Sequence, residues 1–467
     1  MNGNSPTSLS VFLDRKFRLA ENGTNVRTEV MGGIVTFMTM SYILAVNPSI
    51  LGDAGMDRTA VLLATALASA LATFAMAFFG KMPFALSAGM GLNAFLAYTV
   101  VLGRGYSWQL ALFCVFIEGC VFILLTLTSV REMLFNAIPH SLKLAIAAGI
   151  GLFIAFIGLQ NSGIVIANGS TLVGIINFRE NFHTAGISAI LTIIGMFLIF
   201  AMEAKRVKGS ILIGIIGTWI LGIICQLVGL YVPDPAAGYY SVYPALTLTD
   251  WGALGLTFGQ CFNFGAFAGA GILDIFIVTL TFLYSDVVDT TGTLIGGAEK
   301  GKMLDKDGKL PHIKGAFLAD AIGTTIGAIF GTSTVTTFVE SSAGIVAGAR
   351  TGLAAIVTGI LFLLSTFAAS LFTSIPSFAT APALLVVGFM MFTSAGKLEL
   401  ASDDAITEMI PAFLCMLGMV VFYSIAEGIV IGVIAYVVLQ LLSGKAKKIS
   451  PFMYGLAIIF LLKYFLI

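Results

Sequence analysis

Charged residues are scarce in this sequence of 467 residues. Asp, Glu, Lys and Arg make up 10% of it and apolar residues 58%, whereas a soluble domain typically carries about 25% charged residues. This shortage excludes an ordinary water-soluble globular protein. Lys and Arg together number 24, and so do Asp and Glu. A chain without net charge offers no general attraction for nucleic acid or for an anionic surface, so neither is expected as a partner.

Histidine and cysteine are also rare. The five cysteines show neither a CxxC pattern nor metal-ligand spacing, so they are interpreted as small apolar fillers, and no metal or cofactor is expected. His140, His183 and His312 fall in or beside loops, which leaves no histidine for a proton relay inside a membrane. The N-terminal segment is polar and basic through Arg27 and lacks the pattern of a cleavable signal, so the first apolar segment is expected to stay in the mature protein.

What the sequence does contain is a series of apolar runs of roughly 17 to 21 residues, the length that an α-helix needs to cross the hydrocarbon core. We therefore expect an all-α polytopic membrane protein. Fourteen transmembrane segments are predicted, near residues 30–50, 60–79, 84–101, 108–128, 142–160, 185–202, 210–230, 272–296, 313–331, 334–348, 352–372, 381–396, 409–425 and 427–443. The apolar piece at 452–466 is short for a span, and whether it crosses the membrane stays open.

The distribution of basic residues predicts the orientation. With the N-terminal tail, residues 1–29, in the cytoplasm, every Lys and Arg lies on the cytoplasmic side except Arg58, Arg104, Arg179 and Lys463. This imbalance is what the positive-inside rule expects. The sequence shows no transit peptide, which favours a bacterial inner membrane.

The two halves of the chain resemble each other in order. Residues 134–139 (Leu-Phe-Asn-Ala-Ile-Pro) recur as 371–376 (Leu-Phe-Thr-Ser-Ile-Pro), and at the same offset Gly151 corresponds to Gly388. Seven segments per half is an odd number, so the second copy enters the membrane from the opposite face. Such an inverted repeat is typical of transporters. An old duplication without mechanistic meaning is the alternative.

Two of the predicted segments are interrupted. Aligning Gly80 with Gly331 pairs 81–93, which contains a proline and two internal glycines, with 332–344, which begins with a β-branched run. Both are predicted to be short extended leads into half-helices. Since a matched pair of interrupted spans is the best sequence pointer to a transporter's binding site, we expect the site here. Glycines that merely allow close helix packing are the alternative.

Carboxyl groups stand inside two of the apolar segments. Asp286 and Asp289 lie three residues apart in 272–296, roughly on one helix face with Thr290 and Thr293. Glu340 likewise places a carboxyl group inside an apolar segment, 334–348. A carboxyl group at membrane depth needs a partner or a function, and since burial raises the pKa of a carboxyl group, such groups can exchange protons near neutral pH.

The alternative is a purely structural role, in which these acids pair with groups inside the protein and fix contacts between helices. That interpretation is favoured for Asp320, Glu118 and Glu427, which are nearer to segment ends or less supported by neighbours. Asp274 is expected at the membrane interface.

Several motifs resemble a known family, the AzgA-like purine permeases of the nucleobase/ascorbate transporter superfamily. The resemblance begins near residue 17 and continues to the end of the chain. Its motifs are residues 17–29 (Phe-Arg-Leu-Ala-Glu-Asn-Gly-Thr-Asn-Val-Arg-Thr-Glu), 39–48 (Thr-Met-Ser-Tyr-Ile-Leu-Ala-Val-Asn-Pro), 89–95 (Gly-Met-Gly-Leu-Asn-Ala-Phe), 289–294 (Asp-Thr-Thr-Gly-Thr-Leu) and 340–344 (Glu-Ser-Ser-Ala-Gly).

The resemblance implies a fold like that of the bacterial uracil permease, with two inverted seven-segment repeats and short extended pieces in segments three and ten. It implies a core domain at 30–130 and 272–373 and a gate domain at 131–232 and 374–443. Residues 233–271 would form an extracytoplasmic loop and 444–467 a basic and apolar tail. It further implies a homodimer formed through the gate domain.

The resemblance also implies roles for individual residues. Glu340 matches the tenth-segment glutamate that hydrogen-bonds the base, and Asp289 matches the acid motif of segment eight. Gly91 and Asn93 match the motif of segment three. Ala88 departs from the pattern, because many members have proline there, and this departure puts the preferred substrate in doubt. The expected substrate-binding set is Glu340, Asp289, Asn93, Gly91, Thr293, Ser341 and Phe95, and the expected proton-coupling residues are Asp289, Glu340 and Asp286.

These expectations combine into a secondary transporter that imports purine bases by proton symport, with hypoxanthine and guanine favoured and adenine open. An elevator-like movement of the core against the gate is expected. The alternatives are an anion carrier of the same fold for sulfate, bicarbonate or dicarboxylate, and a xanthine or uracil permease. A channel would differ by uptake that does not saturate. An intramembrane enzyme is disfavoured, because no nucleophile and base pair is visible inside the segments.

Overall fold

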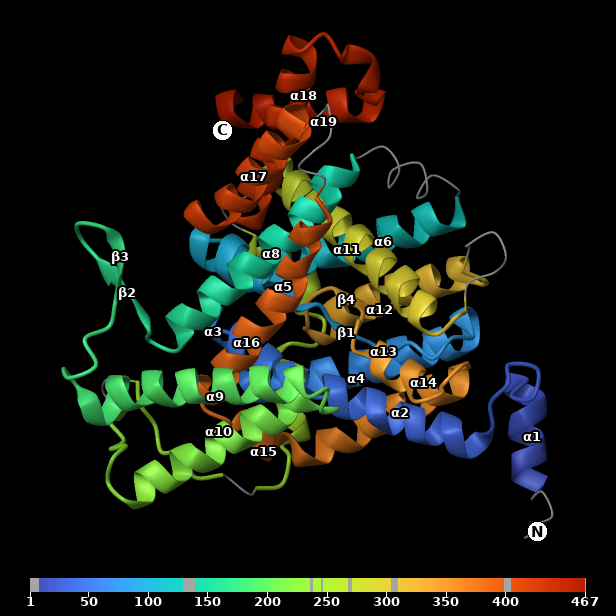
Figure 1. Ribbon diagram of the computed structural model, residues 1–467, viewed down its shortest axis with the longest axis vertical. Helices are drawn as coiled ribbons and strands as arrows, with labels where there is room; N and C mark the ends of the chain where they lie inside the picture. The colour runs from blue at the N-terminus through green and yellow to red at the C-terminus, as the bar shows by residue number, and fades with distance from the viewer. Residues whose placement is uncertain are drawn as a thin grey trace.

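The computed structural model describes residues 8–128, 139–235, 238–244, 247–267, 271–303, 310–398 and 405–466. Helices dominate it (Figure 1). Those of the first half are α1 (Ser8–Phe17), α2 (Val26–Met40), α3 (Ile43–Asp53), α4 (Arg58–Ala75), η1 (Met76–Gly80), α5 (Met90–Ala94), η2 (Phe95–Gly103), α6 (Trp108–Leu127), α8 (His140–Asn161), η3 (Phe182–Gly186), α9 (Ile187–Ala204) and α10 (Ser210–Leu227).

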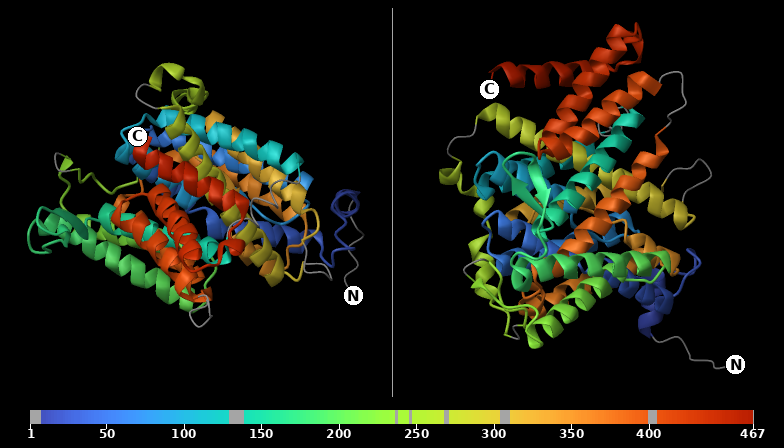
Figure 2. Two further views of the ribbon diagram at one scale, coloured as in Figure 1. Left: turned by 90° about the horizontal axis from the view of Figure 1, so that it is seen from above. Right: turned by 60° about the vertical axis from the view of Figure 1, so that its left-hand side comes forward.

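The second half continues in the same manner. Its helices are α11 (Ile272–Lys300), α12 (Ile313–Phe330), α13 (Ser341–Val346), α14 (Gly352–Ser365), α15 (Ala369–Thr373), α16 (Ser377–Phe392), α17 (Ala405–Val421), α18 (Ile425–Leu442) and α19 (Pro451–Leu466). Within the described residues, four short strands accompany the helices: β1 (Leu86–Ala88), β2 (Val165–Asn168), β3 (Leu172–Ile175) and β4 (Val335–Thr337). The hairpin of β2 and β3 projects at the left of Figure 1 and comes forward in the right-hand view of Figure 2.

The strands β1 and β4 pair with each other in the middle of the helices (Figure 1). They come from opposite halves of the chain and run antiparallel, and all six of their residues are buried. Such a pair satisfies backbone groups that apolar surroundings would leave without partners. The register matches Leu86 with Thr337, Ser87 with Thr336 and Ala88 with Val335.

Hydroxyl groups on two helices complete the pairing at the outer edges of the strands. Thr73 of α4 accepts from the Leu86 amide at 3.0 Å and lies 3.2 Å from its carbonyl oxygen. On the other side, Thr324 of α12 donates to the Val335 carbonyl oxygen at 3.0 Å. A threonine hydroxyl can serve in this way because it both donates and accepts. Threonine hydroxyls therefore bond the backbone groups at the outer edges of this short sheet, where a larger sheet would have further strands.

The helices pack in two sets. The first set surrounds the strand pair and consists of α2, α3, α4, α6, α11, α12, α13 and α14. The second set consists of α8, α9, α10, α16, α17 and α18, with α8 against α16 and α17 against α18 as its main contacts. Gly151 on α8 and Gly388 on α16 lie so close together that a Cβ on either residue would overlap the carbonyl oxygen of the other. These two glycines correspond in the predicted repeat.

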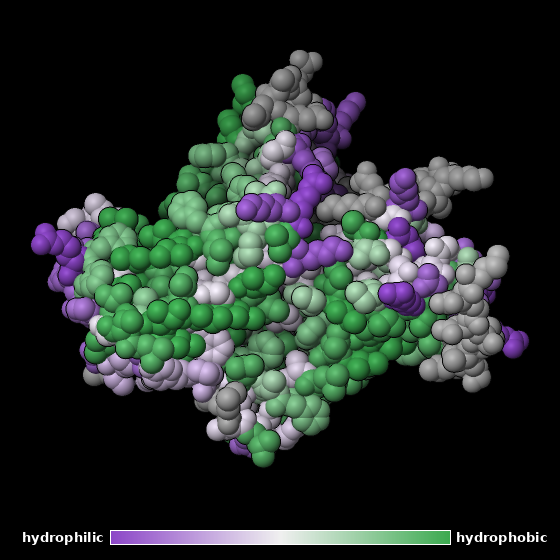
Figure 3. Space-filling view, turned by 60° about the horizontal axis from the view of Figure 1, so that its bottom comes forward, coloured by the Kyte–Doolittle hydropathy of each residue, from purple (hydrophilic) through white to green (hydrophobic). Residues whose placement is uncertain are grey.

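Apolar side chains cover much of the outer surface (Figure 3). Phe197 on α9 and Ile220 and Ile224 on α10 are among the exposed large side chains. Contiguous exposed apolar surface of this extent needs a nonpolar medium or a partner to cover it. Together with the helix lengths, this surface fits a protein whose outer face meets lipid.

Ten helices are long and apolar enough to cross a membrane, within the part of the chain that the structure describes. They agree within a few residues with ten of the fourteen predicted segments, from Val26–Asp53 to Ile425–Leu442. The remaining four contain α5 with η2, α11, α13 and α17. The count of fourteen and the inverted repeat stay predictions, and most of one repeat segment, 134–138, lies outside the described residues.

Glu29 on α2 fixes the start of α14. Its carboxyl oxygens accept from the Arg350 amide at 2.7 Å, the Thr351 hydroxyl at 2.9 Å, and the Ala354 and Thr351 amides at 3.2 and 3.3 Å. The first amides of a helix have no partner inside the helix. Glu29 therefore acts as a cap supplied by a distant helix, and it locks α2 to α14.

Replacing Glu29 with alanine should leave these buried amides without their acceptor. We expect Glu29→Ala to lower the free energy of unfolding by about 3 kcal/mol, as estimated for a lost buried hydrogen-bonding group of this kind. The thermal unfolding temperature of the detergent-purified protein measures this effect. Glu21→Ala is the control, because the ion pair of Glu21 with Arg18 is exposed. Equal unfolding temperatures for Glu29→Ala and wild type would contradict the capping role.

Candidate functional site

Each of the two central strands leads directly into a short helix. The strand β1 is followed by α5, and β4 is followed by α13. The extended leads and half-helices predicted in segments three and ten are thus present. Irregular backbone at membrane depth is tolerated where protein or a solvated cavity satisfies it, so these two junctions are where ligand-binding groups are expected.

Glu340 lies at the junction of β4 and α13, and the first span holds it. Tyr42 donates a hydrogen bond to Glu340 Oε1 at 2.6 Å, and the Thr39 hydroxyl lies 3.3 Å from the Glu340 carbonyl oxygen. Tyr42 is 1% exposed and stands in the two-residue break between α2 and α3. The first span therefore contributes to this junction.

Tyr42 and Phe338 are the residues at this junction that the sequence analysis does not single out. Their rings lie 6.5 Å apart between centroids, and both are buried. The available signal for Tyr42 was its place in the family-like motif 39–48. Its partner could not be found from spacing, since 298 positions separate Tyr42 from Glu340.

Asp289 on α11 belongs to the same group. Its side chain interacts electrostatically with Glu340 and Asp286, and Tyr42 in turn interacts with Asp289. The structure therefore brings together Asp289 and Glu340, the two acids that the sequence analysis places in the pocket.

Asp286 has a second set of neighbours, toward β4 and α12. The Thr290 hydroxyl lies 3.2 Å from Asp286 Oδ1, 2.9 Å from Asp320 Oδ1 and 2.7 Å from the Thr336 hydroxyl. Thr290, Asp286 and Asp320 are fully buried. One hydroxyl donates to one acceptor at a time, so the acids compete for the Thr290 proton. This polar layer ties α11 and α12 to the strand pair.

Glu118 on α6 extends this layer. It is fully buried, and its Oε2 accepts from the Thr334 hydroxyl at 2.7 Å, next to β4. It also interacts electrostatically with Asp286 and Asp320. A structural role is expected for Glu118 from the sequence, and its bond with the Thr334 hydroxyl just before β4 fits that interpretation.

Asn93 and Gly91 lie on α5. Asn93 is fully buried, its Oδ1 accepts from the Ser333 hydroxyl, and its Nδ2 has no hydrogen-bond partner within the described ranges. An amide donor of this kind is available to a ligand oxygen or ring nitrogen. Gly91 packs against Ile150 of α8, because a Cβ at this position would overlap Ile150 Cγ2. The first half-helix therefore touches the second helix set.

The other expected site residues have packing or backbone contacts. Phe95 is buried, and its ring packs edge-on against Phe282 with 4.8 Å between centroids. The Ser341 hydroxyl accepts from the Ala85 amide at 3.0 Å and so ties α13 to the lead of β1. Thr293 is also buried. Their expected contacts with substrate stay predictions.

A cavity lies elsewhere, between α8, α11, α18 and α19. Its lining is almost wholly apolar, and its polar side chains are Thr281 and Tyr284. The Thr281 hydroxyl already donates to the Ile277 carbonyl oxygen at 2.8 Å. A polar ring would find few partners there, so the junction beside Glu340 is the better candidate for a functional site.

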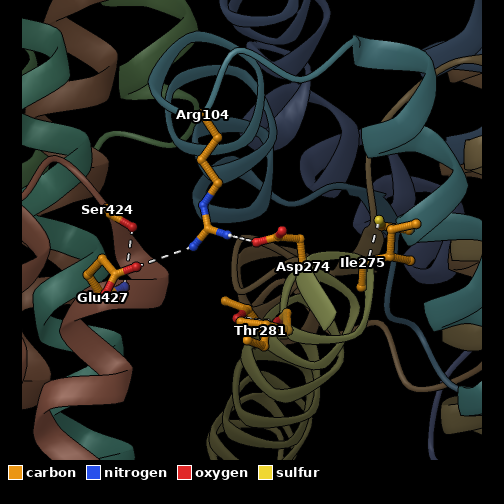
Figure 4. Close-up of polar contacts among 8 residues, drawn as sticks. Arg104, Asp274, Ile275, Thr281, Ser424 and Glu427 are labelled. Atoms are coloured by element: carbon orange, nitrogen blue, oxygen red, sulfur yellow. Dashed lines mark hydrogen bonds and ion pairs between the residues drawn. The ribbon is translucent and has the colours of Figure 1, made fainter. Parts of the chain in front are cut away.

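At one edge of the contact between the helix sets, one arginine joins two carboxyl groups (Figure 4). Arg104 Nη1 lies 3.3 Å from Asp274 Oδ1, and Nη2 lies 3.3 Å from Glu427 Oε1. Asp274 is in the first turn of α11, in the first helix set, and Glu427 in the first turn of α18, in the second. Arg104 follows η2, which continues from α5.

The helix ends explain why these charges are placed here. Acids are favourable at helix N-termini and a cation at a C-terminus, which is where Asp274, Glu427 and Arg104 stand. Ser424 also caps α18 by accepting from the Glu427 amide at 3.2 Å. In the adjoining loop, burial and a hydrogen bond to Asp274 raise the pKa of Tyr106.

Over the ranges that the structure describes, no three or more His, Cys, Asp or Glu side chains gather in a way that could hold a metal ion. The site is thus a set of carboxyl, phenol, amide and hydroxyl groups. Such groups suit a small neutral solute with alternating donors and acceptors.

Comparison with known proteins gives consistent similarities over most of the chain. The Permease family matches residues 27–427. The guanine/hypoxanthine permease PbuG of Bacillus subtilis is 44% identical, with 96% of this chain and 98% of that protein covered. The adenine permease AdeP of Escherichia coli is 38% identical, with 98% and 97% covered. Among solved structures, the transmembrane domain of the cyanobacterial bicarbonate transporter BicA is similar, with a TM-score of 0.59, 16% identity, and 88% and 97% covered.

Proposed function

Since the chain belongs to the Permease family and is thus a transporter rather than an enzyme, we propose that it imports purine nucleobases by proton symport. The proposed location is a bacterial inner membrane, with the N-terminus in the cytoplasm. Hypoxanthine and guanine are the favoured substrates, and adenine is the next candidate.

The substrate class is supported by two relatives that the chain matches over nearly their full length. PbuG is a guanine/hypoxanthine permease and AdeP an adenine permease. The structural similarity to the bicarbonate transporter BicA comes with only 16% sequence identity, so it supports the fold and not the substrate. An anion carrier would also be expected to lack unpaired acids in its pocket, and Asp289 and Glu340 lie together here.

The observation that carries the proposal is the position of Glu340. Its carboxyl group lies at the junction of β4 and α13 with Tyr42 on one oxygen and Asp289 in electrostatic reach. A neutral carboxyl group both donates and accepts hydrogen bonds, which matches the alternating N–H and ring-nitrogen edge of a purine. The buried Asn93 amide supplies a further donor.

Proton coupling follows from the same chemistry. An ionised carboxyl group only accepts hydrogen bonds, so loss of the proton from Glu340 or Asp289 removes a donor to the base. Binding of base and proton thereby support each other, with Asp286 as a further group for exchange. The proton is the coupling ion, and no cofactor takes part.

In the proposed transport movement, the first helix set is the core and the second is the gate. The core carries the strand pair, Asp289 and Glu340, and it slides against the gate in an elevator-like cycle. A homodimer formed through the gate would hold the second set fixed. The ion pair of Arg104 with Glu427 joins core to gate, so it has to open in each cycle, whereas the pair of Arg104 with Asp274 lies within the core.

Uptake of labelled bases tests the proposed function directly. In cells without their own purine permeases, we expect saturable uptake of hypoxanthine or guanine that a protonophore abolishes. Adenine, xanthine and uracil in the same assay determine the specificity. Absence of saturable uptake for every purine would contradict the proposal.

The same assay tests the two acids. Glu340→Gln and Asp289→Asn each preserve size but remove the exchangeable proton, and we expect each to lower purine uptake by at least about a hundredfold, on the scale of losing buried charge-assisted contacts. Membrane content measured by immunoblot should equal that of wild type. Wild-type affinity for purine in either variant would remove that residue from the pocket.

A cross-link tests the movement of core against gate. In a cysteine-free background, Arg104→Cys with Glu427→Cys is treated with a bifunctional thiol reagent that reducing agent can remove. We expect cross-linking to abolish purine uptake and reduction to restore it. The control pair, Arg104→Cys with Asp274→Cys, lies within the core and should keep its uptake after cross-linking. Unchanged uptake in the cross-linked core and gate pair would contradict the movement.

A further inference from the structure

Tyr42 has a role that the acids alone do not explain. Among the described residues, its hydroxyl is the side-chain donor to the Glu340 carboxyl group, at 2.6 Å. We propose that Tyr42 is a positioning residue for substrate binding: it occupies Glu340 Oε1 and leaves Oε2 to face the base. This inference rests on the proposed function and deepens it.

The surroundings of Tyr42 make the contact directional. Its side chain is 1% exposed, and a buried tyrosine hydroxyl needs a partner. The ring packs beside Phe338, at 6.5 Å between centroids, and Phe338 stands on the short segment between β4 and Glu340. The phenol and the carboxyl group are therefore held by the same two chain segments, and rotation of the carboxyl group would break the bond.

The break in the first span is what brings Tyr42 to this position. The helix α2 ends at Met40 and α3 begins at Ile43, and Ser41 and Tyr42 between them keep helical dihedral angles. Interrupted helices in a membrane protein are tolerated where their backbone lines protein or a cavity. The Tyr42 hydroxyl reaches Glu340 at the junction of β4 and α13 in the other half.

Two bonds join the first span to Glu340, and they have different consequences. Thr39 reaches the backbone carbonyl oxygen at 3.3 Å, and its hydroxyl is also 2.9 Å from the Thr36 carbonyl oxygen. This bond can hold α2 near α13, but it cannot orient the carboxyl group. Tyr42 contacts the carboxyl group itself. Comparing the two residues therefore separates helix contact from carboxyl orientation.

Tyr42 also connects the two acids of the site. It interacts electrostatically with Asp289 as well as with Glu340. Removing the hydroxyl would free the Glu340 carboxyl group from its fixed orientation beside Asp289. The effect should appear in substrate affinity, because the acids would then have to be oriented by the base at a cost in entropy.

The test uses the Michaelis constant and maximal rate of hypoxanthine uptake. Tyr42→Phe removes one oxygen and keeps the ring, and we expect its KM to rise about tenfold, at the upper end of what one hydrogen bond contributes. Its maximal rate and membrane content should stay near those of wild type. Thr39→Val removes the backbone contact, and Tyr284→Phe removes a buried hydroxyl that has no partner among the described residues. Both controls should keep KM within about twofold, since neither changes a partner of the carboxyl group.

Three results would overturn the positioning role. One is a KM for Tyr42→Phe within about twofold of wild type, which would show a bond of no consequence for affinity. Another is an equal rise in KM for Thr39→Val, which would assign the effect to helix contact. The third is loss of Tyr42→Phe from the membrane while Tyr284→Phe is retained, which would make the hydroxyl a folding requirement. Failure of the proposed function is distinct, because wild-type protein would then show no purine uptake.

Discussion

The pairing of β1 with β4 is the constraint on which the rest of the structure depends. Extended backbone inside an apolar protein leaves amide and carbonyl groups that its own segment cannot satisfy. Here one strand from each half supplies the partner for the other, and hydroxyls of Thr73 and Thr324 satisfy the outer edges. The two interrupted segments therefore fix each other, and because the strands run antiparallel their half-helices leave the strand pair from its two ends.

This arrangement determines where the acids lie. Glu340 follows β4, and α11 packs against β4 and α13, which brings Asp289 into electrostatic reach of Glu340. The first span contributes Tyr42, which hydrogen-bonds Glu340. On the other side of β4, the buried carboxyl groups of Asp286 and Asp320 share the Thr290 hydroxyl. A rigid, hydrogen-bonded strand pair can thus carry a binding site as one body, as an elevator-like movement requires.

Most of the helices and the principal acids could be predicted from the sequence, because each has a local signal. Apolar runs predict the helices, and the β-branched run at 334–337 predicts β4. Asp289 and Glu340 are recognisable as candidate site residues because each places a carboxyl group inside an apolar run. Tyr42 could not be found in this way, since a phenol in an apolar helix is unremarkable until its partner is known. Arg104 was recognised only as an exception to the charge distribution, because its partners lie 170 and 323 positions away. Contacts between distant segments depend on packing, which local pattern does not specify.

We propose that a purine binds beside the paired strands, with its polar edge on Glu340. The most direct measurement is the structure of the protein with hypoxanthine bound. We expect the base beside the start of α13, hydrogen-bonded to Glu340, with the Tyr42 hydroxyl still on the other carboxyl oxygen. Hypoxanthine bound instead in the apolar cavity beside Tyr284, or anywhere without contact to Glu340, would contradict it.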